Sequence, residues 1–172
     1  MPGLPLIFRF QDDGLVPNNP ALPVLIYKTA LDLSGSGAPA DEIEKLFRAN
    51  GWGRDTWRAG IYSFVHYHAM IHEALGIAQG SAHVQLGGRG GETFTLEPGD
   101  VVVLPAGTGH QRLTESGDLL VIGGYPPEGT YNLCRGDDPA ERVRALTTIP
   151  VVPLPRSDPV LGDEGLPQLW RR

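Results

Sequence analysis

The chain has 172 residues, a mass of 18.5 kDa and a formal net charge of −6, and it is long enough to bury one hydrophobic core. Its 23 glycines and 16 prolines favour many turns and short strands over a helical bundle. The basic residues are scattered along the sequence, which excludes the basic patch that nucleic-acid binding requires.

The sequence also indicates where the protein works. The first residues lack the basic and apolar regions of a signal peptide, and no apolar run approaches the roughly 20 residues of a membrane span. The single cysteine, Cys134, excludes an intrachain disulfide and suits a reducing compartment. We therefore expect a cytoplasmic protein with no membrane partner. Cys134 has no adjacent base, so we interpret it as a buried or incidental thiol.

The N-terminal third is expected to contain two strands and one helix. Apolar runs predict strands over residues 4–10 and 24–31, with a proline-containing loop between them. Residues 41–50 place three apolar side chains at helical spacing, begin with acidic residues and end at Asn-Gly, which predicts a helix. Trp52 and Trp57 follow, and we expect them to cover the end of a barrel rather than contact a ligand.

Residues 60–124 form a series of short runs rich in β-branched and aromatic residues, separated by turn sequences such as EPGD and PAGTG. This spacing is typical of a β-sandwich or β-barrel and not of alternating βαβ units. Residues 125–172 are expected to return to loops, with a short helix around 139–146 and an edge strand at 149–154. Trp170 indicates that this tail docks on the body of the protein.

The candidate functional residues are histidines that gather in two short segments. Four of the five histidines lie within residues 60–80 and 99–110. His66 and His68 are separated by one residue in a strand-like run, so both imidazoles project from the same face. If that face lines a barrel, two nitrogen ligands for a metal ion lie close together.

Two further ligands are expected nearby. His110 follows the tight turn PAGTG. Glu73 needs a bulge to reach the face of His68, whereas His72 reaches that face without one, and these alternatives stay open. Three imidazoles and a carboxylate form a mixed nitrogen and oxygen set that suits a divalent Fe, Mn, Ni, Zn or Cu ion.

Four other side chains are candidates for lining the substrate site. Tyr62, Phe64 and Met70 are expected to line the barrel near the metal ion, with core packing as the alternative for each. Arg112 lies two residues after the last of the four histidines. Its guanidinium could hold an anionic substrate by a bidentate contact, or it could lie at the surface.

Both histidine segments resemble the motifs of the cupin superfamily. The positions that fit the first motif are Gly60, His66, His68, Glu73 and Gly80. The positions that fit the second are Gly99, Pro105, Gly107 and His110. The second motif usually continues to an asparagine, where this chain has Thr114. Along its whole length the chain resembles the small uncharacterised bacterial cupins of the YjlB-like type.

The resemblance implies an all-β fold, the double-stranded β-helix or jelly-roll barrel, with one or two short helices outside the barrel. We expect a single domain over residues 1–172, in which residues 60–124 form the barrel core. Residues 1–59 would supply the N-terminal strands and helix, and residues 125–172 would supply loops and a tail packed on the barrel. The resemblance also implies a homodimer formed through the strands within residues 4–31.

The resemblance further implies that the metal ligands are His66, His68, Glu73 and His110, with His72 at the position between. It leaves the activity open, because cupins include dioxygenases, decarboxylases and isomerases. We expect a metal-dependent enzyme acting on a small organic acid or sugar-like molecule. The alternative is a non-catalytic cupin that binds or senses a small ligand and carries a structural metal.

Overall fold

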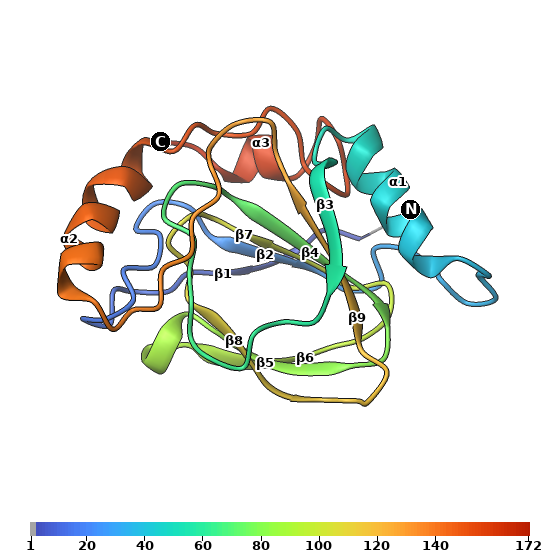
Figure 1. Cartoon of the computed structure of the whole chain (residues 1–172). Coiled ribbons are helices and arrows are strands. Elements are labelled where there is room, and N and C mark those ends of the chain that lie inside the picture. Colours follow the sequence, from blue (N-terminus) through green and yellow to red (C-terminus); the bar gives the residue numbers. More distant parts are fainter. Residues whose placement is uncertain (1–2) are drawn as a thin grey trace.

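The computed structural model describes residues 3–172, which form two antiparallel β-sheets with helices outside them (Figure 1). The strands are β1 (Leu6–Phe8), β2 (Val24–Tyr27), β3 (Arg54–Ala59), β4 (Glu73–Gln79), β5 (Ala82–Leu86), β6 (Glu92–Leu96), β7 (Val101–Leu104), β8 (His110–Glu115) and β9 (Leu120–Tyr125). The α-helices are α1 (Pro39–Ala49), α2 (Pro139–Thr148) and α3 (Leu166–Leu169), and short 3-10 helices span Gly88–Gly90 and Ile149–Val151.

The larger sheet has six strands in the order β1-β2-β7-β4-β9-β3, and the smaller has three in the order β6-β5-β8. All pairings between neighbouring strands are antiparallel. The small sheet lies across from the large one and closes the jelly roll (Figure 1). The prediction of an all-β jelly-roll fold with few short helices is confirmed.

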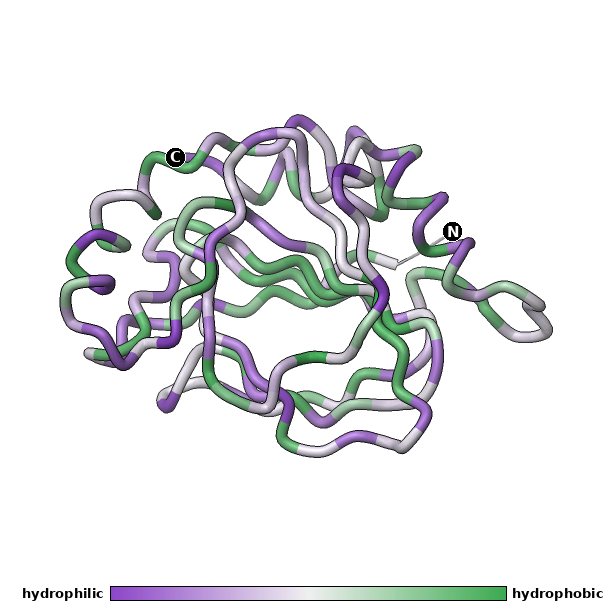
Figure 2. The backbone as a smooth tube through the Cα atoms, in the orientation of Figure 1, coloured by the Kyte–Doolittle hydropathy of each residue, from purple (hydrophilic) through white to green (hydrophobic). Residues whose placement is uncertain are grey.

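Both faces of the large sheet are buried, which explains why its central strands are apolar throughout (Figure 2). In β4, Leu75 and Ile77 pack between the two sheets, while Ala74 and Ala78 pack on the opposite, outer face. This alternation follows from the two-residue period of a strand. The parity of β4 therefore decides which of its side chains face the interior of the barrel.

Helix α1 covers the outer face of the large sheet with one apolar stripe. Ile43 and Phe47 are fully buried there. A Cβ atom added at Gly76 of β4 would lie 2.6 Å from a methyl carbon of Ile43, so this glycine permits the close approach of the helix. The helix ends before Gly51, whose φ of 79° provides the left-handed stop that the sequence predicted.

The C-terminal segment completes the cover of the outer face. The indole of Trp170 is buried and donates a hydrogen bond to the Pro23 carbonyl at 2.8 Å. The fully buried carboxylate of Asp158 accepts a hydrogen bond from the Tyr27 hydroxyl of β2. The carboxylate also accepts three backbone N–H groups of its own segment, from Val160, Leu161 and Leu166. This one carboxylate therefore fastens the C-terminal segment to the sheet.

Two local predictions were wrong and one strand was missed. Residues 54–59 form a strand that the sequence did not indicate, because this edge strand is mostly exposed and carries charged rather than alternating apolar residues. Residues 60–72 are an extended loop with isolated bridges instead of a regular strand. The segment 149–154 begins with a 3-10 helix that continues α2, because Pro150 at its start suits a helical φ.

Candidate metal centre

The loop that carries the His-x-His pair is held on both sides by backbone pairing. His66 exchanges two backbone hydrogen bonds with His110 of β8, at 3.1 and 2.9 Å. The intervening Tyr67 exchanges two with Cys134, both at 2.9 Å. The pairing keeps this stretch extended, so the side chains of His66 and His68 lie on the same side.

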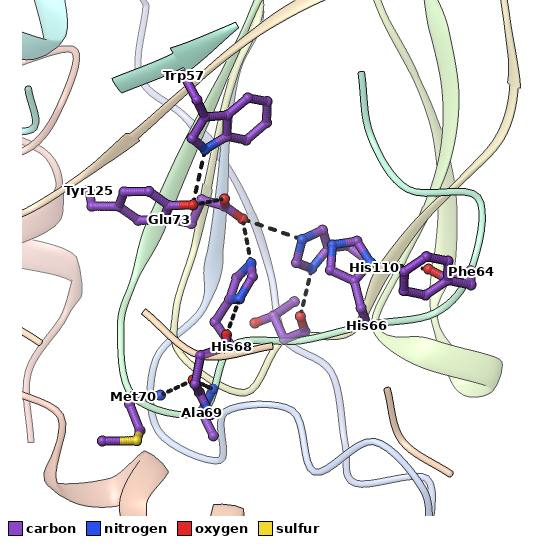
Figure 3. A network of polar contacts seen from close by, with 11 residues as sticks. Trp57, Phe64, His66, His68, Ala69, Met70, Glu73, His110 and Tyr125 are labelled. Atoms are coloured by element: carbon purple, nitrogen blue, oxygen red, sulfur yellow. Dashed lines mark hydrogen bonds and ion pairs between the residues drawn. The ribbon is translucent and has the colours of Figure 1, made fainter. Parts of the chain in front are cut away.

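The structure brings four of the five ligand candidates together (Figure 3). One ring nitrogen from each of His66, His68 and His110 lies within 4.8 Å of the other two, and all three side chains are buried. Glu73 is the first residue of β4, and its side chain lies on the same face as Leu75 and Ile77, which points to the interior of the barrel. Its Oε2 lies 3.2 Å from Nε2 of His68 and 3.3 Å from Nε2 of His110.

Backbone carbonyls fix the orientation of the three imidazoles. Each Nδ1 faces a carbonyl oxygen, which can only accept a hydrogen bond, so Nδ1 carries the proton. Each Nε2 therefore has a lone pair available for a metal ion. The pairs are His66 with Phe64 at 3.1 Å, His68 with Asn132 at 2.6 Å and His110 with Thr108 at 2.9 Å.

The carboxylate of Glu73 fits the same arrangement. Its Oε2 is buried and accepts no hydrogen bond from the described residues. Three imidazole lone pairs thus lie close together, and the carboxylate oxygen faces two of them, those of His68 and His110. A divalent cation would satisfy these groups, so the residues present fit the metal ion that the resemblance to cupins implies.

The pKa shifts reflect the same convergence. Burial lowers the pKa of His66 to about 3, and neighbouring His110 adds to this effect. Burial opposes ionisation of Glu73, but His68 and His110 outweigh it and hold the Glu73 pKa well below its usual range. Burial also lowers the pKa of His68, yet the Glu73 carboxylate prevails and the pKa is raised.

His72 lies on the other side of the sheet, away from the cluster. Its Nδ1 accepts a hydrogen bond from the Ala106 N–H at 2.9 Å, and its Nε2 donates one to the Pro153 carbonyl at 3.2 Å. Its ring packs against Trp170 with centroids 4.8 Å apart. Both nitrogens are therefore engaged, and burial lowers the pKa of His72 to about 3, which keeps the ring neutral.

A cavity of about 390 Å³ opens beside the cluster. Four aromatic side chains form much of its wall, together with Ile61 and Leu75, and no lysine or arginine of the described residues lines it. The aromatic residues are Trp57, Tyr62, Tyr125 and Tyr131.

Of the four residues predicted to line the substrate site, one lies in the cavity wall and three do not. Tyr62 lines the cavity, whereas Phe64, Met70 and Arg112 are not among the residues of its wall. The guanidinium of Arg112 donates a hydrogen bond to the Ile61 carbonyl at 3.1 Å and lies 3.4 Å from Glu115. These contacts engage the guanidinium with a backbone carbonyl and a carboxylate of the protein itself.

Sequence reasoning missed a hydrogen-bonded chain that ends at Glu73. The Trp57 indole donates a hydrogen bond to the Tyr125 hydroxyl at 3.0 Å. That hydroxyl in turn donates to Oε1 of Glu73 at 3.1 Å. No motif signals Trp57 or Tyr125, because they stand on strands other than that of Glu73. Trp57 was expected to cover the barrel end, but it lines the cavity.

Two further observations concern the rest of the chain. Cys134 is buried, and burial raises the pKa of its thiol to about 11, so it is not a thiolate at neutral pH. Within residues 3–172, every helix is too short or too polar to cross a membrane.

Comparison with known proteins shows the family. No protein-family model matches the chain. Uncharacterized protein YjlB of Bacillus subtilis (strain 168) is 36% identical over 164 residues, which are 95% of this chain and 94% of that protein. This relative has no assigned activity.

Solved structures give weaker matches. Acireductone dioxygenase from Bacillus anthracis, with a cadmium ion in its active centre, has a TM-score of 0.42 at 18% identity, covering 62% of this chain and 80% of that one. Oxalate decarboxylase from Bacillus subtilis has a TM-score of 0.38 at 16% identity, and the match covers 87% of this chain and 37% of that one. The near-full-length identity with YjlB decides the assignment, and the chain belongs to the same family as YjlB.

Proposed function

We propose that this protein is a metal-dependent enzyme whose metal ligands are His66, His68, Glu73 and His110. The observation that carries the proposal is a cluster of three imidazole lone pairs beside a buried carboxylate oxygen, which faces two of them and accepts no hydrogen bond from the described residues. The donor set suits a divalent Fe, Mn, Ni, Zn or Cu ion. Such an ion would supply a Lewis acid for a substrate oxygen or a binding position for O₂.

The cavity beside the cluster supports an enzyme over a purely structural metal site. Structural sites are closed by protein ligands, whereas catalytic sites keep a position open to substrate. Here about 390 Å³ of space adjoins all four proposed ligands. The aromatic wall would exclude water around a bound molecule and hold it by apolar contact.

The charges that line the cavity limit the class of substrate that it could bind. Glu73 is the only charged residue in the described wall, and Arg112 is engaged elsewhere. A negative charge on a substrate would therefore have to be neutralised by the metal ion itself. This favours a neutral, sugar-like molecule or an organic acid with one carboxylate, handled by dioxygenase, decarboxylase or isomerase chemistry.

The alternative is a cupin that binds or senses a small ligand without turnover. One observation favours it, because the described cavity wall has no acid or base beyond the four proposed ligands and three tyrosines. The pKa of Tyr125 is raised by burial and by Glu73, so this tyrosine would stay protonated.

Metal content and one substitution test the proposal. Purified protein from metal-replete medium is expected to carry about one ion per chain by elemental analysis, and His68→Ala is expected to lose it. Wild-type protein that takes up no stoichiometric metal would refute the site. Protein that binds metal but turns over no neutral or monocarboxylate compound in a broad panel would support the binding alternative.

We further propose that the protein is a homodimer. The support is β1, which is an edge strand of the large sheet and exposes Leu6 and Ile7, with exposed Leu4 just before it. Exposed apolar residues on an unpaired edge favour strand pairing with a second copy. Sedimentation velocity is expected to give a dimer that Ile7→Lys weakens, and a monomeric wild type would contradict the proposal.

The single domain and the cytoplasmic location are also proposals. The contact between the Trp170 indole and the Pro23 carbonyl supports one folding unit, because it joins distant parts of the chain. The lone buried Cys134 supports a reducing compartment. Limited proteolysis and localisation of a tagged protein would test these two points.

A further inference from the structure

We propose that Tyr125 and Trp57 are positioning residues that aim the Glu73 carboxylate at the metal ion. The inference rests on the proposed function, because it concerns the same metal site. The contacts form a chain of two hydrogen bonds, from the Trp57 indole to the Tyr125 hydroxyl and from that hydroxyl to Oε1 of Glu73 (Figure 3).

The direction of this chain is fixed by chemistry. An indole N–H can only donate, so the Tyr125 hydroxyl must accept from Trp57. The tyrosine then has its own proton free to donate, and the ionised carboxylate of Glu73 can only accept it. Hydrogen bonds that polarise one another along such a chain strengthen each other.

The result is a carboxylate whose two oxygens have different tasks. Oε1 accepts the Tyr125 hydrogen bond at 3.1 Å. Oε2 accepts no hydrogen bond from residues 3–172 and faces Nε2 of His68 and His110. Fixing one oxygen leaves the other as a single, oriented donor, which is how groups behind metal ligands commonly act.

The large sheet provides a rigid frame for the chain of contacts. Glu73 begins β4, Tyr125 ends β9 and Trp57 lies in β3, and these three strands are consecutive in the sheet. Trp57 pairs in register with Gly123 of β9. A Cβ atom at Gly123 would lie 1.9 Å from the Trp57 ring, so the indole occupies space that only glycine leaves open. Sites built on strands hold their geometry better than sites on loops.

The test is the metal affinity of Tyr125→Phe, which keeps the ring and removes the hydroxyl. Metal-free protein is titrated with Zn²⁺ against a competing chelator, and the Cu²⁺-loaded protein is examined by electron paramagnetic resonance. We expect roughly 10–100-fold weaker Zn²⁺ binding and an altered Cu²⁺ spectrum. A role in packing alone would change the melting temperature and leave both readouts as in the wild type.

Trp57→Phe tests the outer link of the chain. It removes the hydrogen bond to Tyr125 and is expected to weaken Zn²⁺ binding less than Tyr125→Phe does. Because the two links act in series, the double variant should bind no more weakly than Tyr125→Phe alone. If the two losses of Zn²⁺ affinity add in the double variant, Trp57 and Tyr125 act independently, and the proposed series of two hydrogen bonds is refuted. If Tyr125→Phe does not fold, wild-type affinity in Trp57→Phe would overturn it as well.

Tyr27→Phe is the matched control. It removes a hydroxyl that donates to another buried carboxylate, that of Asp158, on the outer face of the sheet. We expect a lower melting temperature with unchanged Zn²⁺ affinity and Cu²⁺ spectrum. If Tyr125→Phe behaves in the same way, the inference fails while the metal site stands. If the wild type binds neither ion, the proposed function itself fails, and the inference fails with it.

Discussion

Replacing His72 by alanine separates the two ligand alternatives that the sequence leaves open. His72 is fully buried, and its Nδ1 accepts the N–H of buried Ala106. Leaving a buried donor unsatisfied costs about 1–3 kcal/mol. Losing the contact of the ring with Trp170 adds about 0.5–1.5 kcal/mol. We therefore expect His72→Ala to lower the free energy of unfolding by about 3 kcal/mol.

That loss corresponds to a fall in melting temperature of about 6–12 °C for a chain of this length. Scanning calorimetry of metal-free protein measures the fall, and elemental analysis after reconstitution is expected to give the wild-type metal content. Glu73→Gln should behave oppositely, with little change in the melting temperature of the metal-free protein and a loss of metal. Loss of metal from His72→Ala, or a melting temperature within about 2 °C of wild type, would refute this reasoning.

Three further outcomes follow from the same contacts. Metal at 100 times its dissociation constant should stabilise the protein by about 2.7 kcal/mol, which raises the melting temperature by about 5–11 °C. A chelator should reverse this shift, and an unchanged melting curve would speak against a bound ion. Asp158→Ala leaves four hydrogen-bond donors without their acceptor, and it should lower the free energy of unfolding in guanidinium by roughly 4 kcal/mol, clearly more than Tyr27→Phe does. Equal losses in the two variants would contradict the role of Asp158 in holding the C-terminal segment on the sheet. Hydrogen bonding from Arg58 lowers the pKa of Glu44 below 4.5, so its ionised form stabilises the fold above pH 4.5 and this stability is lost as the pH falls through the lowered pKa. Glu44→Gln should flatten acid unfolding in that range, and a steeper dependence would count against the ion pair.

Several features were predictable because they depend on neighbours in the sequence. The apolar runs and turn sequences between residues 60 and 124 gave the strands β4 to β9. Helical spacing and the Asn-Gly stop gave α1. The strand β3 was not predictable, because an exposed edge strand with charged residues is stabilised by its pairing with β9 and not by its own pattern.

The choice between Glu73 and His72 depends on the residue from which the alternation of side chains along a strand is counted. Counting forward from His68 put His72 on the metal-facing side, but the chain between them is not a strand. Counting back along β4 from Ile77 and Leu75, which face the interior, puts Glu73 on the same face. The signal was present in the sequence, but only the structure showed which count applies.

By itself the sequence determined the two histidine motifs, a β-sandwich or β-barrel class and the mixed nitrogen and oxygen character of the site, because spacing and residue chemistry are local properties. The tertiary structure decided which carboxylate or imidazole joins the three histidines. It also decided that Trp57 and Tyr125 stand behind Glu73, and that Arg112 is not part of the cavity wall. These outcomes depend on hydrogen bonds between segments far apart in the chain. Such contacts are set by strand order and sheet register, which no local pattern specifies.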